Sequence, residues 1–281
     1  MISTKKKWIT IGTLFGICLV FIFLGAFAVP KQSAFVYEYA EQLKNREIGG
    51  VVTKMPKNSV NIFLRGYFGV DFGKYTEFDD FLTTKAALDN HRVSAIWVSD
   101  VTADYLCKKG NYRALRPASA PGLGEERLEF GFVFRSVDTA LKDRANEMLA
   151  KFEDNGITQK LFNYFVNDGK SDALCGLSGK GRVLRVGVTG AVPPLEMVDE
   201  RGNVSGVAVE LSKYLAAYLD MKVKFVVVDN DTAFSQLMAG KVDMLACYGT
   251  SENHSTEFPD YLMSNGYCSM KDYCLLVNVE K

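Results

Sequence analysis

The stretch VDMLACYGTSENHST, from Val242 to Thr256, joins an apolar run to a cluster of hydroxyl and other polar side chains. The apolar part predicts a β-strand, and Tyr248, Thr250 and Ser251 lie at its carboxyl end. Because ligands of α/β proteins bind outside the carboxyl ends of the strands, we expect these side chains to hydrogen-bond a ligand. His254 has two interpretations, a surface residue at a helix start or a ligand for an anion.

Residues for covalent, acid–base or metal chemistry are few. The chain has two histidines, His91 and His254, which disfavours a histidine-built metal or catalytic centre. The adjacent Asp79 and Asp80 fall on a helical stretch, where a pair of carboxylates is typical of a solvated face. We therefore expect no catalytic residue, no metal site and no cofactor, and we do not predict an enzyme.

The six cysteines show no metal-binding spacing. We expect buried free thiols; for an exported chain, the alternative is a disulfide between Cys247 and Cys268 or Cys274. Sequence alone does not fix the pairing.

The N-terminus carries a membrane signal. Lys5, Lys6 and Lys7 precede an uncharged run from Trp8 to Val29 that is long enough to cross a bilayer. We expect residues 1–34 to be an uncleaved anchor, with the following residues on the extracytoplasmic face of the cell membrane. The alternative is a signal peptide cleaved after Ala26-Phe27-Ala28, which would release a secreted or periplasmic protein.

Charge argues against one class of partner. The chain has 33 Lys+Arg and 33 Asp+Glu, so it carries no net charge, and no basic stripe with interleaved aromatic residues is present. Binding to nucleic acid depends largely on such positive charge. We therefore expect no nucleic-acid partner.

Strands and helices alternate in the remaining sequence, in two blocks. In the first block, GGVVT, VSAIWVS and LEFGFVFRS read as strands, and VDTALKDRANEMLAKFEDNG and ITQKLFNYFVND read as helices. A Gly-rich passage, NDGKSDALCGLSGKG, separates the blocks. In the second block, LRVGVTG, KVKFVVVD, VDMLACYG and YCLLVNV read as strands, and VAVELSKYLAAYLD and DTAFSQLMAGK read as helices. This alternation predicts an α/β protein with parallel sheets.

The second block resembles the first lobe of an extracellular solute-binding protein of the polar amino-acid type. The matching pieces are LRVGVTGAVPPLEMVDERGNVSGVAVELSKYLA, VKFVVVDNDTAFSQLMAGKVDML and EFPDYLMSNGY. The first block resembles that family's second lobe and its return into lobe one, in the pieces REIGGVVTKMPKNSV, HRVSAIWVSDVTADYL and LEFGFVFRSVDTALKDRANEMLAKFEDNGITQKLF. The resemblance implies a two-lobed periplasmic-binding-protein-like fold of type II, with ligand between the lobes.

The lobes occur in reversed order, because the family begins with lobe one. We therefore expect a circularly permuted fold behind an N-terminal transmembrane helix; the alternative is two truncated pieces of tandem domains. The expected domains are residues 1–34 (anchor or signal peptide), 35–128 (lobe two), 129–168 (return strand and closing helices of lobe one), 169–182 (linker) and 183–281 (main part of lobe one).

The resemblance also implies roles for single residues. In the family, a Thr is followed five residues later by an Arg that clamps the ligand carboxylate. Thr250 matches the Thr, but Ser255 stands at the position of the Arg. The family's amine-binding Asp falls on Ser99 or Asp100.

Two further positions complete the expected ligand set. Lys54 and Asn58 lie where lobe two would offer polar groups, and the alternative for both is a solvated loop residue. Asn230 occupies the position of a frequent aromatic residue. Standard amino acids should therefore bind weakly, and an amino-acid-like molecule, an amine or an organic acid is the expected small polar ligand.

The resemblance supports one function over two others. We expect a membrane-tethered receptor that passes a small polar solute to the permease of an ABC importer. The alternative is a module that senses the ligand and regulates a membrane partner. An enzyme on the same fold is a third possibility, disfavoured because no pair of positioned acids is found in the cleft segments.

Overall fold

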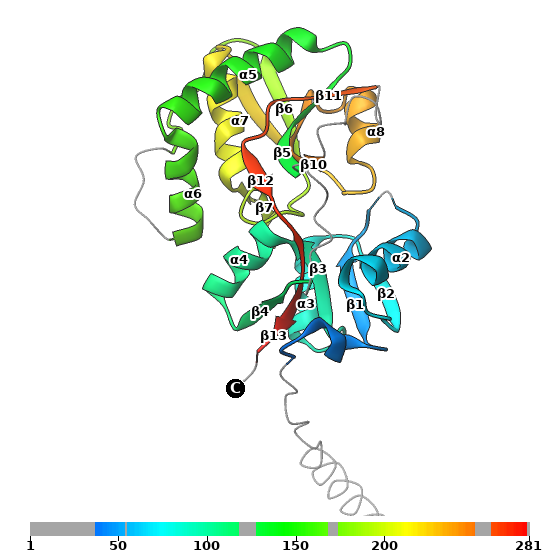
Figure 1. Cartoon of the computed structure of the whole chain (residues 1–281). Coiled ribbons are helices and arrows are strands. Elements are labelled where there is room, and N and C mark those ends of the chain that lie inside the picture. Colours follow the sequence, from blue (N-terminus) through cyan, green and yellow to red (C-terminus); the bar gives the residue numbers. More distant parts are fainter. Residues whose placement is uncertain (1–36, 54, 118–127, 168–173, 251–259, 280–281) are drawn as a thin grey trace, which may run out of the picture. The chain divides into compact units, whose positions relative to one another are not determined.

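The computed structural model describes residues 37–53, 55–117, 128–167, 174–250 and 260–279. These residues form two lobes, each built on one β-sheet flanked by helices (Figure 1). We keep the names lobe one and lobe two. The run from Trp8 to Val29 lies outside the described residues, and no described helix is long and apolar enough to cross a membrane.

Lobe two is built on a five-stranded sheet in the order β2-β1-β3-β13-β4. Strands β1, β2 and β3 are parallel, whereas β13 is antiparallel to both β3 and β4. The strands are β1 (Glu47–Val51), β2 (Lys74–Phe78), β3 (Ala95–Ser99), β4 (Tyr112–Leu115) and β13 (Tyr273–Asn278), and the helices are η1 (Ala40–Leu43), α2 (Lys57–Phe68), α3 (Phe81–Asp89) and α4 (Asp100–Lys109).

Local chemistry explains these elements. The side chain of Asp80 accepts a hydrogen bond of 2.7 Å from the Thr83 amide, which caps the start of α3. In β1, a side chain at Gly49 would lie 2.9 Å from the ring of Phe78. The glycine therefore lets an aromatic residue of the neighbouring strand pack directly on the β1 backbone.

Lobe one is built on a six-stranded sheet in the order β11-β5-β10-β6-β9, with β12 also pairing with β5. Strands β6, β9 and β10 are parallel, and β5 runs antiparallel to β10, β11 and β12. The strands are β5 (Leu128–Arg135), β6 (Val183–Val188), β9 (Lys222–Val227), β10 (Met244–Thr250), β11 (Tyr261–Met263) and β12 (Cys268–Met270), the hairpin is β7 (Met197–Val198) with β8 (Val204–Ser205), and the helices are α5 (Thr139–Asp154), α6 (Ile157–Asn167), α7 (Val207–Tyr218) and α8 (Ala233–Met238).

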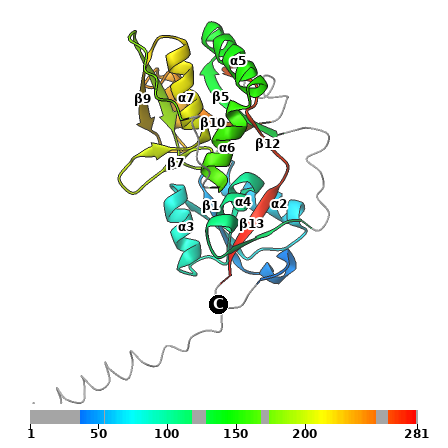
Figure 2. The same ribbon diagram turned by 90° about the vertical axis from the view of Figure 1, so that its left-hand side faces the viewer.

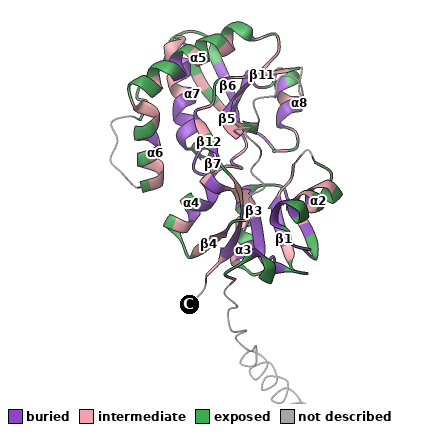
Figure 3. Ribbon diagram, in the orientation of Figure 1, coloured by how far each residue is buried: buried purple, intermediate pink, exposed green. Residues whose placement is uncertain are grey.

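The core of lobe one lies where α7 packs on the sheet. Phe132, Phe134 and Leu184 are fully buried together with Val207 and Leu211 of α7. Figure 3 shows this concentration of buried residues on α7 and the central strands. The apolar faces of the strands and of α7 therefore bury the same cluster, as the strand and helix periodicities of the sequence predict.

One chain segment passes from lobe one to lobe two between β12 and β13 (Figure 1 and Figure 2). We expected residues 183–281 to form the main part of lobe one, but Tyr273–Asn278 lies in the lobe two sheet. The apolar pattern of this strand identifies it as buried but does not specify which sheet it joins. Leu275 and Val277 pack in one cluster with Ala40 and Leu43, at the start of the described chain.

The described cysteines are free thiols. They are Cys107, Cys175, Cys247, Cys268 and Cys274, and Cys247 and Cys274 are buried. Burial raises the pKa of Cys274 to about 12, so this thiol is protonated at neutral pH.

Replacement of Leu275 by Ala tests the place of β13. Leu275 is 0% exposed, so Leu275→Ala should lower the free energy of unfolding by about 2–5 kcal/mol. The matched control, Leu177→Ala, removes the same atoms from a side chain that is 69% exposed and should change it by less than about 0.5 kcal/mol. Urea denaturation followed by circular dichroism measures both; equal small effects would contradict a central position for β13.

Candidate ligand-binding cleft

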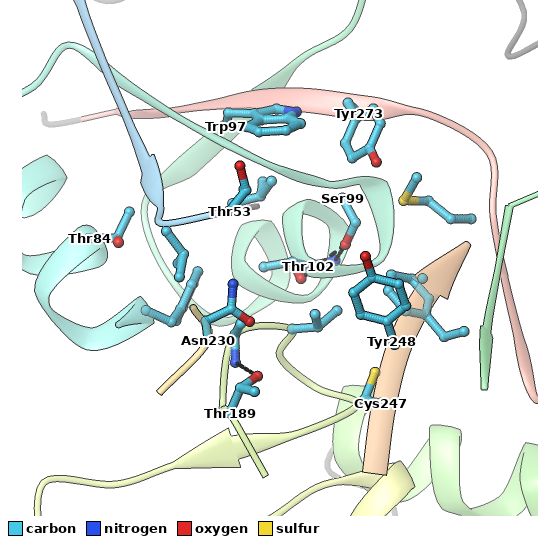
Figure 4. Close-up of a pocket in the computed structure, with 18 of the residues that line it drawn as sticks. Thr53, Thr84, Trp97, Ser99, Thr102, Thr189, Asn230, Cys247, Tyr248 and Tyr273 are labelled. Atoms are coloured by element: carbon cyan, nitrogen blue, oxygen red, sulfur yellow. Dashed lines mark hydrogen bonds between the residues drawn. The ribbon is translucent and has the colours of Figure 1, made fainter. Parts of the chain in front are cut away.

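A cavity of about 350 Å³ lies between the two lobes. Ser99 and Trp97 reach it from lobe two, Thr189 and Tyr248 reach it from lobe one, and Tyr273 reaches it from the start of β13 (Figure 4). Its volume is in the range of small-molecule sites in proteins. Each lobe contributes groups that donate or accept hydrogen bonds.

In lobe two, polar groups at the carboxyl edge of the sheet face the cavity. Thr53 follows β1, and its hydroxyl accepts a hydrogen bond of 3.2 Å from the Met55 amide. Ser99 ends β3 and caps α4, accepting a hydrogen bond of 3.2 Å from the amide of Thr102. Strand ends and a helix start thus hold the hydroxyls in fixed positions.

In lobe one, Thr189 directly follows β6 and its hydroxyl donates to the buried carboxylate of Glu196. The hydroxyl also accepts a hydrogen bond of 3.2 Å from the amide of Ala191. Burial raises the pKa of Glu196 to about 7, although hydrogen bonds from Thr189 and nearby amides act in the opposite direction.

Aromatic rings form much of the remaining wall. The rings of Trp97 and Tyr273 are 5.0 Å apart, and those of Phe234 and Tyr248 are 4.8 Å apart in an edge-to-face arrangement. Burial raises the pKa of Tyr273 to about 12, so its hydroxyl is a neutral donor at physiological pH. These rings offer flat apolar surface to a solute next to the hydroxyl groups.

One hydrogen bond joins the lobes across the cavity. The side-chain amide of Asn230, which follows β9 in lobe one, donates to the carbonyl of Val52 in lobe two at 2.5 Å. Asn230 lines the cavity, and Val52 lies between two lining residues, Val51 and Thr53. The bond holds the lobes together on the side away from the connecting segment (Figure 4).

The connecting segment is itself anchored to lobe two. The carboxylate of Asp100 accepts a hydrogen bond of 3.1 Å from the Lys271 amide, and the Asp100 amide donates to the Asp272 carbonyl at 2.9 Å. The Tyr67 hydroxyl donates to the Asp272 carboxylate at 3.2 Å and accepts from the Tyr273 amide at 3.1 Å. These bonds fix the chain where it leaves lobe one, so they mark a hinge.

The structure brings together only part of the predicted ligand set. Tyr248 and Ser99 line the cavity. Asp100, predicted to meet a ligand amine, is 6% exposed, and its carboxylate accepts from the amides of Lys271 and Val101 instead. Asn58 lies exposed on the first turn of α2 and does not line the cavity.

The other predicted positions fall outside the description. Lys54, Ser251 and His254, together with Ser255 at the clamp position, lie outside the described residues. Thr250 is the last residue of β10, paired with Glu129, and its side chain is not described.

Several cavity residues were not predicted as ligand contacts. Thr189 directly follows β6 and Thr53 lies two residues after β1, and this position after a parallel strand was a usable signal. Tyr273 was not expected because its strand belongs to the other lobe from the one predicted. Asn230 was noted only as a departure from the family.

Comparison with known proteins finds a family match within the second block. Residues 184–266 match the model of the bacterial extracellular solute-binding proteins, family 3. The resemblance stated from the sequence is thereby confirmed over this part of the chain, and the two sheets give it the α/β fold of periplasmic binding proteins. No curated protein matches the chain.

Solved structures similar to the chain include three from bacteria. The BvgS VFT2 domain of Bordetella pertussis is 12% identical with a TM-score of 0.43, covering 83% of this chain and 80% of its own. Truncated, arginine-bound ArgBP from T. maritima is 15% identical with a TM-score of 0.44, covering 83% and 87%. The amino acid ABC transporter substrate-binding protein AbpA from Streptococcus pneumoniae, bound to L-arginine, is 11% identical with a TM-score of 0.41, covering 85% and 83%.

Removal of the Asn230 amide should open the cleft. The lost interlobe hydrogen bond contributes about 0.5–1.5 kcal/mol, so Asn230→Ala should raise the open population roughly 2- to 10-fold. Acrylamide quenching of Trp97, made the sole tryptophan by Trp8→Phe, should increase. Asn203→Ala is the matched control, because that amide bonds to Asp199 within lobe one. Equal quenching in both variants would show that the Asn230 bond does not hold the lobes together.

Proposed function

We propose that this chain is an extracytoplasmic solute-binding protein that captures a small polar solute between its two lobes. The supporting observation is the cavity itself, whose walls combine hydroxyls from lobe two, Thr189 and Tyr248 from lobe one, and Tyr273 from the hinge side. A solute bound there would contact both lobes at once. Binding would therefore favour the closed arrangement over the open one.

We propose delivery to an ABC importer as the biological role. The family description that matches residues 184–266 is that of extracellular solute-binding proteins, which supports a position outside the cytoplasm. An importer requires a receptor that differs in shape between its empty and filled states. A hinge anchored at Asp100 and Tyr67 and an interlobe bond at Asn230 would supply that difference.

We also propose that the chain is a circular permutation of one two-lobed domain. In support, β13 follows lobe one in the sequence but occupies the lobe two sheet between β3 and β4. In an unpermuted chain, β13 would continue into the segment before β1, and its Leu275 packs against Ala40 and Leu43 of that segment. Truncated tandem copies would not be expected to complete each other in this way.

Screening with small solutes tests the binding function. Because a ligand of the folded state raises its stability by mass action, at least one amine, amide, organic acid or amino acid should raise the melting temperature. Unmodified glutamine, arginine and histidine should give small shifts, since Ser255 replaces the Arg that would bind their carboxylate with hydrogen bonds of about 1.5–3 kcal/mol each. Tight binding of these amino acids would contradict the ligand assignment, and no shift with any solute would contradict the function.

A membrane tether is the last part of the proposal, and it rests on the sequence from Lys5 to Val29. Expression of the full chain should place it in the membrane fraction with the N-terminal run intact. Fractionation followed by determination of the mature N-terminus measures this. A soluble form beginning at Val29 would instead establish a cleaved signal peptide and a freely diffusing receptor.

A further inference from the structure

Glu196 is a carboxyl group buried beneath the cleft. It is 1% exposed and lies in the loop that joins β6 to β7. Its carboxylate accepts hydrogen bonds from the Thr189 hydroxyl and, at 3.3 Å, from the Thr189 amide, and the amides of Gly190 and Ala191 also donate to it. Solute capture by the cavity walls does not require a buried carboxyl at this position, and burial of a carboxylate without a cationic partner is costly.

The bonds of Thr189 determine what its hydroxyl can offer to a solute. A hydroxyl has one proton and two lone pairs. An ionised Glu196 can only accept, so the Thr189 hydroxyl donates to it. The Ala191 amide donates to the Thr189 oxygen at 3.2 Å and so occupies one of its two lone pairs. Thr189 lines the cavity (Figure 4), so its second lone pair can accept from a solute there, whereas its proton is already donated to Glu196.

Protonation of Glu196 reverses this arrangement. A carboxylic acid has its own O–H, which can donate to the Thr189 oxygen. The Thr189 proton is then free to turn into the cavity and donate to a solute. One proton on a buried residue thus changes Thr189 from an acceptor into a donor.

The groups that face Glu196 stay neutral near physiological pH. Among the described residues, these are the thiol of Cys247 on β10 and the hydroxyl of Tyr267, which precedes β12 and donates to the Ala246 carbonyl at 2.8 Å. Burial raises the pKa of both groups well above their ordinary values. Glu196 is therefore the group in this cluster whose charge changes near neutrality.

We propose that Glu196 is a positioning residue that holds Thr189 as a hydrogen-bond acceptor, so that the cleft selects solutes that donate to Thr189 and binds them more tightly when Glu196 is ionised. The inference rests on the proposed solute-binding function and adds the class of solute group, an N–H or O–H donor, together with its pH linkage. With its pKa raised to about 7, Glu196 populates both states near neutral pH.

A pair of uncharged probes tests the selection directly. Benzamide has a flat ring for the aromatic wall and an NH₂ donor, whereas methyl benzoate has a similar ring and an ester that only accepts. Calorimetric titration of the full chain spans about two pH units on either side of neutrality. Benzamide should bind about tenfold more weakly one unit below the Glu196 transition, because about a tenth of the protein is then in the accepting state. Methyl benzoate should bind no more weakly at acidic pH.

Three variants separate positioning from general structural effects. Glu196→Gln keeps an oxygen that accepts from Thr189 and should remove the pH dependence of benzamide binding. Thr189→Val should weaken benzamide binding and also remove the pH dependence. Thr53→Val is the matched control, because Thr53 lines the same cavity from lobe two and its hydroxyl is bonded to the Met55 amide. It should leave the pH dependence intact.

A measurement without ligand tests the titration by itself. A carboxyl whose pKa rises from 4.5 to about 7 on folding binds its proton more tightly in the folded protein. The stability that this proton adds to the folded protein is fully present at acidic pH and is lost as pH rises through about 7. The melting temperature of the wild type should therefore fall relative to that of Glu196→Gln as pH rises over that range.

Each outcome decides the inference. The inference would be overturned if benzamide and methyl benzoate bound with the same pH dependence, or if Glu196→Gln kept the pH dependence of benzamide binding. It would also be overturned if neither probe bound, or if the melting temperature showed no pH step. Any of these results, combined with a solute from the screen that still binds, would leave the proposed function standing. Failure of every solute in the screen would contradict the proposed function itself.

Discussion

The structure depends on a single strand, β13, which follows lobe one in the sequence but lies in the sheet of lobe two. β13 lies between β3 and β4, so both of its edges hydrogen-bond within lobe two. Its alternating side chains bury both faces: Leu275 and Val277 enter one core cluster, and Cys274 and Leu276 enter the other. Without β13, the inner edges of β3 and β4 would be left with unpaired backbone groups in the middle of a sheet.

The same strand sets the geometry of the cleft. Two residues separate β12 from β13, so the chain leaves the sheet of lobe one at Met270 and enters the sheet of lobe two at Tyr273. Met270 and Tyr273 line the cavity, and Asp100 and Tyr67 bind the backbone between them. Hinge and ligand site are therefore adjacent, and a solute that contacts Tyr273 lies where the rotation of the lobes begins. Asn230 forms an interlobe hydrogen bond on the opposite side of the cavity.

Periodicity and turn residues were enough to predict most of the elements and the α/β class, whereas the two-lobed arrangement was predicted from the family resemblance. Runs such as VSAIWVS and LRVGVTG form β3 and β6, and VAVELSKYLAAYLD forms α7, because their apolar residues match the faces that the sheets bury. The sheet to which β13 belongs could not be predicted in this way, since YCLLVNV is apolar enough to fill either core. That choice is made by tertiary pairing with Ile96 and Trp97 of β3.

Prediction of the site was less complete, for a physical reason. Tyr248 was found because the carboxyl ends of strands face the cleft, and Ser99 was found through the family resemblance. Asp100 occupies the same kind of position, but its carboxylate is already bonded to the amides of Lys271 and Val101. Glu196 follows two prolines in a loop and reads as a surface acid, and only the folded loop reveals that Thr189 covers it. Side-chain direction at a strand end is set by partners distant in sequence, which spacing does not encode.

Native-state hydrogen exchange of β13 tests the central claim most directly. If β13 is an internal strand of lobe two, it opens together with β3. The opening free energies measured for the amides of Leu275 and Leu276 should then equal that of the Ile96 amide in β3. The account predicts equal protection for these amides. Exchange of the β13 amides at the rate of a frayed chain end, while Ile96 stays protected, would contradict it.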